Sequence, residues 1–359
     1  MWIEKLTLRD FRNYAHLNLS FRPGVNVLSG PNGSGKTNIV EAIFYLVFAN
    51  SFRTNEDIDL IRDNHPIAYI EGIFQKGKNE QKVQIELQPS GRKIALNGRG
   101  LRRLSELNSV GNALVFTPKD VFFFDDAPRL RRRYLDTNIS KNANYYLRTL
   151  VVGEKALKER NRLLKQKEPD RTHLAIITKK LIEASEIIVN YRAEYLEKIQ
   201  KSFDYVLGEI SSGIPPIKLN YSPFVSLGPK WKERAQKAYD RLLETDLEQR
   251  STSIGYQRED FTAEIDGKEI TTSASQGQKR LIAMALKLAP YFLIEDEEKK
   301  PIIFLDDGLS ELDEKHRDKL LKFLTNLNQT FITVTKYAES AAIHYAIDNR
   351  QNVTRKDSI

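Results

Sequence analysis

Cysteine is absent from the 359-residue sequence, and this absence removes several kinds of site. The chain has no disulfide framework, no thiolate metal site and no cysteine nucleophile. Its length is sufficient for two lobes with their own hydrophobic cores, so stability does not require covalent cross-links. The lack of disulfides fits a reducing compartment.

The sequence also lacks a leader and a long hydrophobic run. Its first residues, "MWIEKLTLRDFRNY", have none of the basic start, apolar stretch and small-residue cleavage site of a signal peptide. The longest apolar run, "NIVEAIFYLVFA", is shorter than the ~18 residues of a spanning helix and carries Glu41. We therefore expect a cytoplasmic protein that needs no membrane.

Acidic residues are too few to balance the basic ones, which leaves a net charge of +8 and an isoelectric point near 9.3. Such an excess favours a polyanionic partner, because basic side chains that neutralise phosphates release counterions. The basic residues concentrate in the first half, in "RKIALNGRGLRR", "PRLRRRYLD" and "KALKERNRLLKQK". Any one run could be a solvated surface, but together they favour nucleic acid. The candidate DNA contacts are Arg102, Arg103, Arg131, Arg132 and Arg133.

Periodicity and chain breakers divide the sequence into three stretches. The first 100 residues read as short strands and a hairpin, with one helix after Thr37. From Pro128 to about Ile210 the pattern is helical, with a break at "KQKEPDRTH". A breaker-rich segment and a third helix around 231–245 follow, and then strands and helices alternate. We expect an α/β fold with a helical arm inserted into a nucleotide-binding head, with boundaries at 1–120, 121–244 and 245–359.

The strongest chemical signal is "GPNGSGKT", Gly30 to Thr37, which fits G-x-x-x-x-G-K-[ST] at every position. It follows an apolar strand and opens a helix, as such a phosphate-binding loop must. Its glycines let the backbone wrap phosphate oxygens, and the free N–H groups of the helix start point at them. Lys36 should reach the β and γ phosphates, and Thr37 should ligate Mg²⁺. A chance glycine-rich turn is the alternative.

A buried strand ending in two acids, "PIIFLDD", supplies the second half of such a site. In a parallel sheet these acids would lie at the carboxyl edge, where ligands bind. We expect Asp306 to hold the magnesium and Asp307 to polarise the attacking water. An ordinary acidic turn is the alternative.

Between these two motifs lies "SASQGQKRLIAMALKLA", a helix that starts with small polar residues. Ser275 is a natural N-cap, and Gln276, Gly277 and Gln278 offer further donors around the first turn. The phosphates already have a helix start beneath them, that of the loop's own helix. We therefore expect Ser275–Gln278 to bind the γ phosphate of a nucleotide on a second subunit.

The order of these motifs resembles the ABC-type ATPases, the class that includes SMC proteins. More closely, the chain resembles the RecF family of bacterial recombination mediators. The matches run along nearly the whole sequence: "LTLRDFRNY", "GPNGSGKTN", "SFRT", "VFTPKD…RLRRRYLD", "SQGQKRLIAMALKLA" and "LDDGLSELDEKHRDKLL". The combination of "RRRYLD", "SQGQ" and "DDGLSELD" is much more specific than the phosphate-binding loop alone.

This resemblance implies an ABC-type head with mixed β-sheets and a helical arm. It implies a homodimer that forms when ATP and Mg²⁺ are bound, a weak, DNA-stimulated ATPase, and binding to gapped or duplex DNA where single and double strands meet. RecR, and RecO in the same pathway, would be its partners in loading RecA, within recombinational repair, replication restart and the response to DNA damage.

The resemblance also implies roles for particular residues. The nucleotide would be held by Gly30, Pro31, Asn32, Gly33, Ser34, Gly35, Lys36, Thr37 and Asn38, with Arg12 and Asn13 on its base or ribose side. Ser310 and Asp313 would lie at the dimer interface, and Thr335 is a candidate for the residue that senses the γ phosphate.

Other interpretations stay open at this point. A transporter ATPase subunit shares the three motifs but would need a membrane partner. An SMC-like structural protein would need far more helical heptads than this chain has. A DNA-binding scaffold that uses ATP only structurally would show no turnover. The cluster Arg131–Arg133 could face the nucleotide or brace the arm instead of binding DNA.

Overall fold

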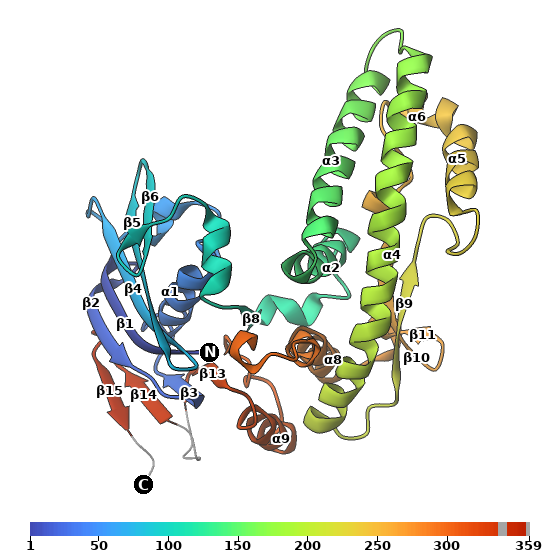
Figure 1. The fold of residues 1–359 in the computed structure, drawn as a ribbon. Helices are drawn as coiled ribbons and strands as arrows, with labels where there is room; N and C mark the ends of the chain where they lie inside the picture. The colour runs from blue at the N-terminus through green and yellow to red at the C-terminus, as the bar shows by residue number, and fades with distance from the viewer. Residues whose placement is uncertain (337–342, 357–359) are drawn as a thin grey trace. The chain divides into compact units, whose positions relative to one another are not determined.

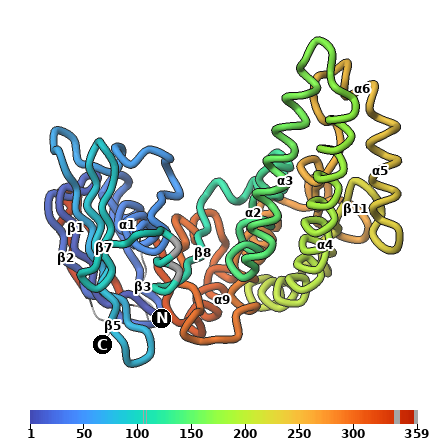
Figure 2. Tube along the Cα trace, turned by 45° about the horizontal axis from the view of Figure 1, so that its top comes forward, coloured from blue at the N-terminus to red at the C-terminus, as the bar shows by residue number. Residues whose placement is uncertain are grey.

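The computed structural model describes residues 1–336 and 343–356 and divides into two compact units. The first unit contains residues 1–121, 206–212 and 280–359, and the second contains residues 122–205 and 213–279. Figures 1 and 2 show the chain from two directions. Within the part of the chain that is described, no helix is long and apolar enough to cross a membrane.

The first unit contains two six-stranded sheets. One sheet has the strand order β2-β1-β4-β5-β6-β7. Each pair of neighbouring strands in it is antiparallel. In β5 the buried residues Val83, Ile85 and Leu87 alternate with more exposed ones, the period expected of a strand with one face on a core. Its strands are β1 (Trp2–Phe11), β2 (Tyr14–Ser20), β4 (Ala68–Lys76), β5 (Asn79–Gln88), β6 (Gly91–Leu96) and β7 (Arg99–Gly100).

The second sheet of this unit has the order β15-β14-β3-β13-β12-β8, and its central strands are parallel. β12 and β13 are buried along their whole length, as strands covered on both faces must be. The strands are β3 (Gly24–Ser29), β8 (Ala113–Phe116), β12 (Ile302–Leu305), β13 (Gln329–Val334), β14 (Ile343–Ile347) and β15 (Val353–Lys356).

Helix α1 (Lys36–Phe48) belongs to the core of the first unit and touches strands of both sheets. Its Ile39, Ile43 and Leu46 are fully buried in the same apolar cluster as Leu6 and Phe304. This anchoring fixes the start of α1, and therefore the loop before it. Two more helices of the unit, α8 (Gln276–Leu288) and α9 (Glu314–Leu324), flank β12 in the sequence.

In the second unit, the helices α3 and α4 run side by side in both views (Figures 1 and 2). The long α4 ends within the first unit, and α8 begins in the second unit at Gln276. The helices are α2 (Pro128–Asn142), α3 (Asn144–Leu164), α4 (Arg171–Ile210), α5 (Trp231–Arg241), α6 (Leu243–Gln249) and α7 (Ile270–Ser273); the small sheet has β9 (Ile217–Ser222), β10 (Asp260–Ile265) and β11 (Lys268–Glu269).

The expected helices are present, with their break after Leu164, but two strands were missed. β2 pairs with β1, although only Tyr14 and Leu17 of its sequence, "YAHLNLS", are buried. β9 lies inside the segment that we had read as breakers. β9 is an edge strand that pairs only with β10, so prolines on either side of it break no ladder.

Residues 245–279 differ from the division expected from the sequence. We had assigned them to the head, but β10 pairs with β9 along its whole length and also contacts α2. As a compact unit, this stretch therefore goes with the helical part, and the first unit resumes only at Arg280. The boundaries 121 and 244 remain a prediction about functional domains.

Candidate nucleotide-binding site

The loop Gly30–Thr37 joins β3, a central parallel strand, to α1. Three of its glycines have backbone angles that disfavour other residues, with φ of 157° at Gly30, 81° at Gly33 and 104° at Gly35. Two of them are also crowded. A Cβ at Gly30 would lie 2.2 Å from the carbonyl oxygen of Ile347, and one at Gly35 would lie 2.6 Å from the Tyr14 hydroxyl. The loop therefore requires the glycines that the motif contains.

The start of α1 is left open for an anion. Gly35 provides no side-chain cap, and the first turn carries no acidic residue. The first N–H groups of the helix have no intrahelical partner, and the positive end of the helix dipole adds to their attraction for phosphate. The hydroxyl of Ser34 is buried and has no hydrogen-bond partner within residues 1–336 and 343–356. A buried unsatisfied hydroxyl is costly, so this atom fits a site whose ligand completes it.

Lys36 folds back over the loop. Its Nζ donates to the carbonyl oxygens of Gly30 at 2.7 Å and Pro31 at 2.8 Å. Burial lowers the pKa of Lys36, and the nearby carboxylates of Asp307 and Asp306 act in the opposite direction. These two carboxylates hold a positive charge beside the loop, where a phosphate would need it.

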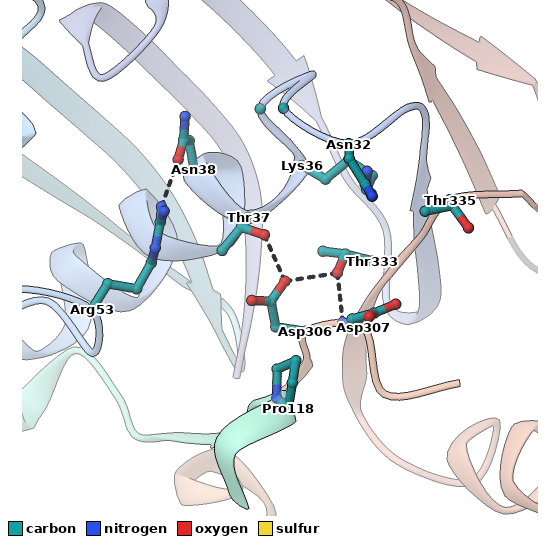
Figure 3. Close-up of a pocket in the computed structure, with 12 residues that line it drawn as sticks. Asn32, Lys36, Thr37, Asn38, Arg53, Pro118, Asp306, Asp307, Thr333 and Thr335 are labelled. Atoms are coloured by element: carbon teal, nitrogen blue, oxygen red, sulfur yellow. Dashed lines mark hydrogen bonds between the residues drawn. The ribbon is translucent and has the colours of Figure 1, made fainter. Parts of the chain in front are cut away.

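Asp306 and Thr37 come together as the two motifs predict. The Thr37 hydroxyl donates to Oδ1 of Asp306 at 2.7 Å, and the Thr333 hydroxyl donates to the same oxygen at 2.8 Å (Figure 3). Asp306 follows β12, and Thr333 lies on the neighbouring β13. The parallel pairing of β3, β13 and β12 therefore aligns the ends of three strands at one edge of the sheet.

Asp307 is held by its backbone. Its N–H donates to the Thr333 hydroxyl at 2.8 Å, and its φ of 51° is in the left-handed region, which is uncommon for residues other than glycine. Its carboxylate accepts no hydrogen bond from the residues that the structure describes, and it lines the same pocket as Lys36. A carboxylate left free at the pocket wall is available to polarise a water.

These groups surround a pocket of about 360 Å³, within the usual range for a small-molecule site (Figure 3). The pocket is lined by residues of the phosphate loop and the start of α1, by the two acids after β12, by one threonine on β13 and one just after it, and by Arg53 and Pro118. These residues are Asn32, Gly33, Gly35, Lys36, Thr37, Asn38, Arg53, Pro118, Asp306, Asp307, Thr333 and Thr335. Thr335, the candidate γ-phosphate sensor, thus lies at this pocket.

The residues fit Mg²⁺ through the chemistry of their donors. No group of three or more acidic, histidine or cysteine side chains that could hold a metal occurs within 1–336 and 343–356. Mg²⁺ in nucleotide sites does not need one, because it is bound by one or two protein oxygens together with phosphate oxygens and waters. The Thr37 hydroxyl and the Asp306 carboxylate, 2.7 Å apart, are two such oxygens.

Arg12 and Asn13 occupy supporting positions rather than the pocket wall. Arg12 holds both carboxylate oxygens of Glu41, at 2.7 and 2.9 Å, and Asn13 accepts a 2.7 Å hydrogen bond from the Asn38 amide. Glu41 is fully buried on α1 and also pairs with Arg53 at 3.0 Å. Arg53 lines the pocket and was missed by the sequence analysis, which quoted "SFRT" without assigning its arginine a role.

The helix start at Ser275 is capped as expected. The Gln278 N–H donates to the Ser275 hydroxyl at 3.3 Å, and the Ser275 N–H donates to the Gln278 side-chain oxygen at 2.9 Å. This reciprocal pair is a capping box. Gly277 has no other atom within 4 Å of where its Cβ would be, so the first turn is open to a ligand.

The two residues predicted at a dimer interface follow Asp307. Ser310 donates to the Asp307 carbonyl oxygen at 2.9 Å and accepts from Arg280 at 3.0 Å. Asp313 caps α9 by accepting from the His316 N–H at 2.9 Å, while most of its side chain is exposed. Hydrogen bonds from His316 lower the pKa of Asp313.

The arginines proposed for DNA divide into two groups. Arg102, Arg103 and Arg133 are exposed. Arg131 is buried, pairs with Asp260 through two 2.8 Å hydrogen bonds and donates to the carbonyl oxygens of three residues before α2. Arg132 donates to the Glu259 carbonyl oxygen. Arg131 therefore braces the second unit, which was the open alternative, and we no longer propose it as a DNA contact.

Together, the strand-loop-helix, the acidic strand β12 on the far side of β13 and the capped helix before β12 in the sequence define a P-loop nucleotide-binding head of the ABC and SMC type. A family model described as "RecF/RecN/SMC N terminal domain" matches residues 2–356. The chain belongs to the RecF family. It is 37% identical to "DNA replication and repair protein RecF" of Halalkalibacterium halodurans and 35% identical to that of Bacillus subtilis, each over 93% of both chains.

Solved structures agree with this assignment. A structure described as the recombination mediator protein RecF-ATP in the RecFOR pathway matches with a TM-score of 0.85 and 31% identity, over 99% of this chain and 97% of that one. An Smc head domain derived from Pyrococcus furiosus matches with a TM-score of 0.59 at 19% identity and covers 99% and 96% of the two chains, which shows the shared fold. The expected α/β ATPase-head fold is confirmed.

Proposed function

We propose that this chain binds ATP and Mg²⁺ in the pocket around Lys36 and hydrolyses the ATP slowly. The contact between Thr37 and Asp306 carries the proposal, because it joins the phosphate loop to the acidic strand at one edge of the sheet. The solved relative described as RecF-ATP, which this chain matches over nearly its full length, supports the choice of nucleotide.

Each group has a role in this reaction. The loop N–H groups and Lys36 bind the phosphates, and the Lys36 charge offsets the negative charge that develops on the transferred group. Thr37 and Asp306 would hold the magnesium, whose positive charge would offset that of the phosphates. Asp307 orients and polarises the attacking water. Arg53 adds a second positive charge at the pocket wall.

We further propose that two copies assemble around ATP, with Ser275–Gln278 of one copy at the γ phosphate of the other. The capping box leaves Gly277 and the exposed start of α8 accessible, which suits this role. Such a dimer would bind two nucleotides at equivalent composite sites, as two-fold symmetry requires.

The ATP-bound dimer would bind DNA, and the chain would act in replication and repair like its curated relatives. The net charge of +8 and the exposed Arg102, Arg103 and Arg133 support a polyanion partner. We extend the proposal to DNA-stimulated turnover and to gapped DNA where single and double strands meet. There the chain would act in the cytoplasm with RecR, and indirectly with RecO, to load RecA. The alternative is a DNA-binding scaffold that does not hydrolyse ATP.

Sedimentation with and without ATP, repeated with gapped DNA, tests this function, together with a phosphate-release assay. We expect ATP to shift the chain to a dimer, DNA to bind the dimer more tightly, and phosphate release to be slow and to depend on Mg²⁺. A chain that stays monomeric with ATP contradicts the dimer. Dimerisation without any phosphate release favours the scaffold.

A further inference from the structure

Arg280 on α8 contacts the segment that follows Asp307 at three points. Its NH2 group donates to the Asp307 carbonyl oxygen at 2.9 Å and to the Ser310 hydroxyl at 3.0 Å, and its NH1 group donates to the Glu311 carboxylate at 2.8 Å. One guanidinium therefore spans the turn from Asp307 to Glu311. Arg280 was not singled out by the sequence analysis, because its partners lie on another segment.

The contacts of Arg280 contribute little to the stability of the fold. Only 3% of Arg280 is exposed, and its Nε, also buried, has no hydrogen-bond partner among the residues that the structure describes. The carboxylate paired with it belongs to Glu311, whose side chain is 81% exposed and thus largely keeps its hydration. Removing a guanidinium from water is costly unless its partners compensate fully, and here they do not. The position of Arg280 therefore requires a reason other than stability.

The turn that Arg280 holds has a strained backbone. Asp307 has a φ of 51° and Glu311 a φ of 63°, both left-handed conformations that cost non-glycine residues free energy. Such conformations persist only where surrounding contacts maintain them. At Asp307 these contacts act on both sides of the residue: Thr333 accepts from its N–H, and Arg280 and Ser310 both donate to its carbonyl oxygen.

The direction of the Asp307 carboxylate depends on these backbone contacts. No residue in the described ranges donates a hydrogen bond to that carboxylate, so nothing else aims it into the pocket. Arg280 itself is absent from the pocket lining. Its influence on the site therefore passes through the main chain of Asp307.

We propose that Arg280 is a positioning residue for the ATPase reaction: it fixes the turn Asp307–Glu311 and thereby aims the Asp307 carboxylate at the attacking water. This inference rests on the proposed function of the pocket. It also assigns the Ser310 hydroxyl, predicted to face a second subunit, an internal role as the second donor to the Asp307 carbonyl oxygen. Arg280 lies two residues after Gln278 on α8, so the contacts to the turn and the proposed γ-phosphate contact come from one helix.

The test compares Arg280→Gln, Arg280→Lys and Glu311→Gln with the parent chain. Arg280→Gln cannot reach all three partners, and Arg280→Lys keeps the charge and one or two of the hydrogen bonds. Glu311→Gln keeps the guanidinium and its bond to Asp307, and so serves as the matched control for loss of the ion pair. For each protein, kcat and KM for ATP, the affinity for a fluorescent ATP analogue, and amide exchange of residues 307–311 and of α1 are measured.

We expect Arg280→Gln to lower kcat by at least about tenfold, since a shift of ~1 Å in a catalytic group can cost up to ~10²-fold. Nucleotide affinity should change much less, because Lys36, Thr37 and Asp306 do not contact Arg280. Arg280→Lys should recover part of kcat, and Glu311→Gln should stay close to the parent. Amides of the turn should exchange faster in Arg280→Gln, with those of α1 unchanged.

Equal losses of kcat and nucleotide affinity, with faster exchange throughout the first unit, would mean that Arg280 only supports folding and would overturn the inference. Unchanged kcat and exchange in Arg280→Gln would also overturn it. A parent chain that binds the analogue but releases no phosphate contradicts the proposed hydrolysis instead. In that case, unchanged exchange of the turn in Arg280→Gln refutes the role of Arg280, and faster exchange there supports its hold on the turn.

Discussion

The Thr37 hydroxyl donates a 2.7 Å hydrogen bond to Oδ1 of Asp306, although most of the chain separates the two residues. Thr37 lies in the first turn of α1 and Asp306 follows β12, and the intervening strand β13 pairs with both β3 and β12. Sheet pairing thus assembles a phosphate loop and a metal-binding carboxylate from opposite ends of the sequence.

Replacing Lys36 should disable the nucleotide site. In Lys36→Ala the γ phosphate loses its main cationic partner, so ATP should bind more weakly and should no longer drive dimerisation. Sedimentation with increasing ATP measures both effects. A variant that dimerises with ATP as readily as the parent would refute the assignment of Lys36.

Replacing Asp307 should separate chemistry from binding. Asp307→Asn keeps the size of the side chain but removes the charge that polarises water, so turnover should fall by ~10²-fold or more. ATP should still bind and bridge the dimer, which should live longer. Phosphate release and dimer lifetime are measured on the same sample; an unchanged rate would move the base to another residue.

The exposed arginines of the first unit should contribute to DNA binding. Replacing Arg102 and Arg103 by alanine should weaken binding and reduce the slope of log affinity against log salt by about 0.9 for each phosphate that the protein no longer neutralises. The control is Arg131→Met, which should lower thermal stability and leave the salt slope unchanged, because Arg131 is paired internally. An unchanged slope in the double variant would place the DNA elsewhere.

Arg192 should be critical for the stability of the second unit. Only 1% of its side chain is exposed, and it pairs with Asp136 at 2.9 Å and Glu259 at 3.2 Å. Arg192→Met would leave two carboxylates without their counter-charge, at a cost of about 3–5 kcal/mol in the free energy of unfolding. Arg171, on the same helix as Arg192, forms an exposed pair with Glu244, and Arg171→Met should cost about 1 kcal/mol or less. Urea unfolding measures both; equal effects would contradict the difference in burial.

The parts of the site that the sequence predicted are those encoded by local spacing. The glycines of the phosphate loop, the acids after β12 and the cap at Ser275 are each defined by neighbours in the chain. The parts that it missed depend on partners far along the chain. Arg131 meets Asp260, and Arg280 meets the turn after Asp307. The sequence of an arginine run does not reveal which of its members has a distant partner. Arg131 is therefore buried, whereas Arg133 in the same run is exposed.

The composite site is tested most directly with Ser275→Arg. If Ser275 only caps its own helix, its replacement costs about 1 kcal/mol of stability and leaves association intact. If it faces the γ phosphate of a second copy, the bulky side chain blocks both symmetric contacts. Dimerisation should then fail, although each chain still binds ATP through Lys36 and Asp306.

Mixing Ser275→Arg with Lys36→Ala protein, followed by sedimentation with ATP, is the decisive measurement. The mixed dimer has one site with both defects and one site in which an intact phosphate loop faces an intact Ser275. We predict that neither variant dimerises alone and that the mixture recovers ATP-dependent association at about half of the sites, as expected for contacts made in trans. Normal dimerisation of Ser275→Arg alone, with no recovery in the mixture, would contradict a nucleotide site shared between two chains.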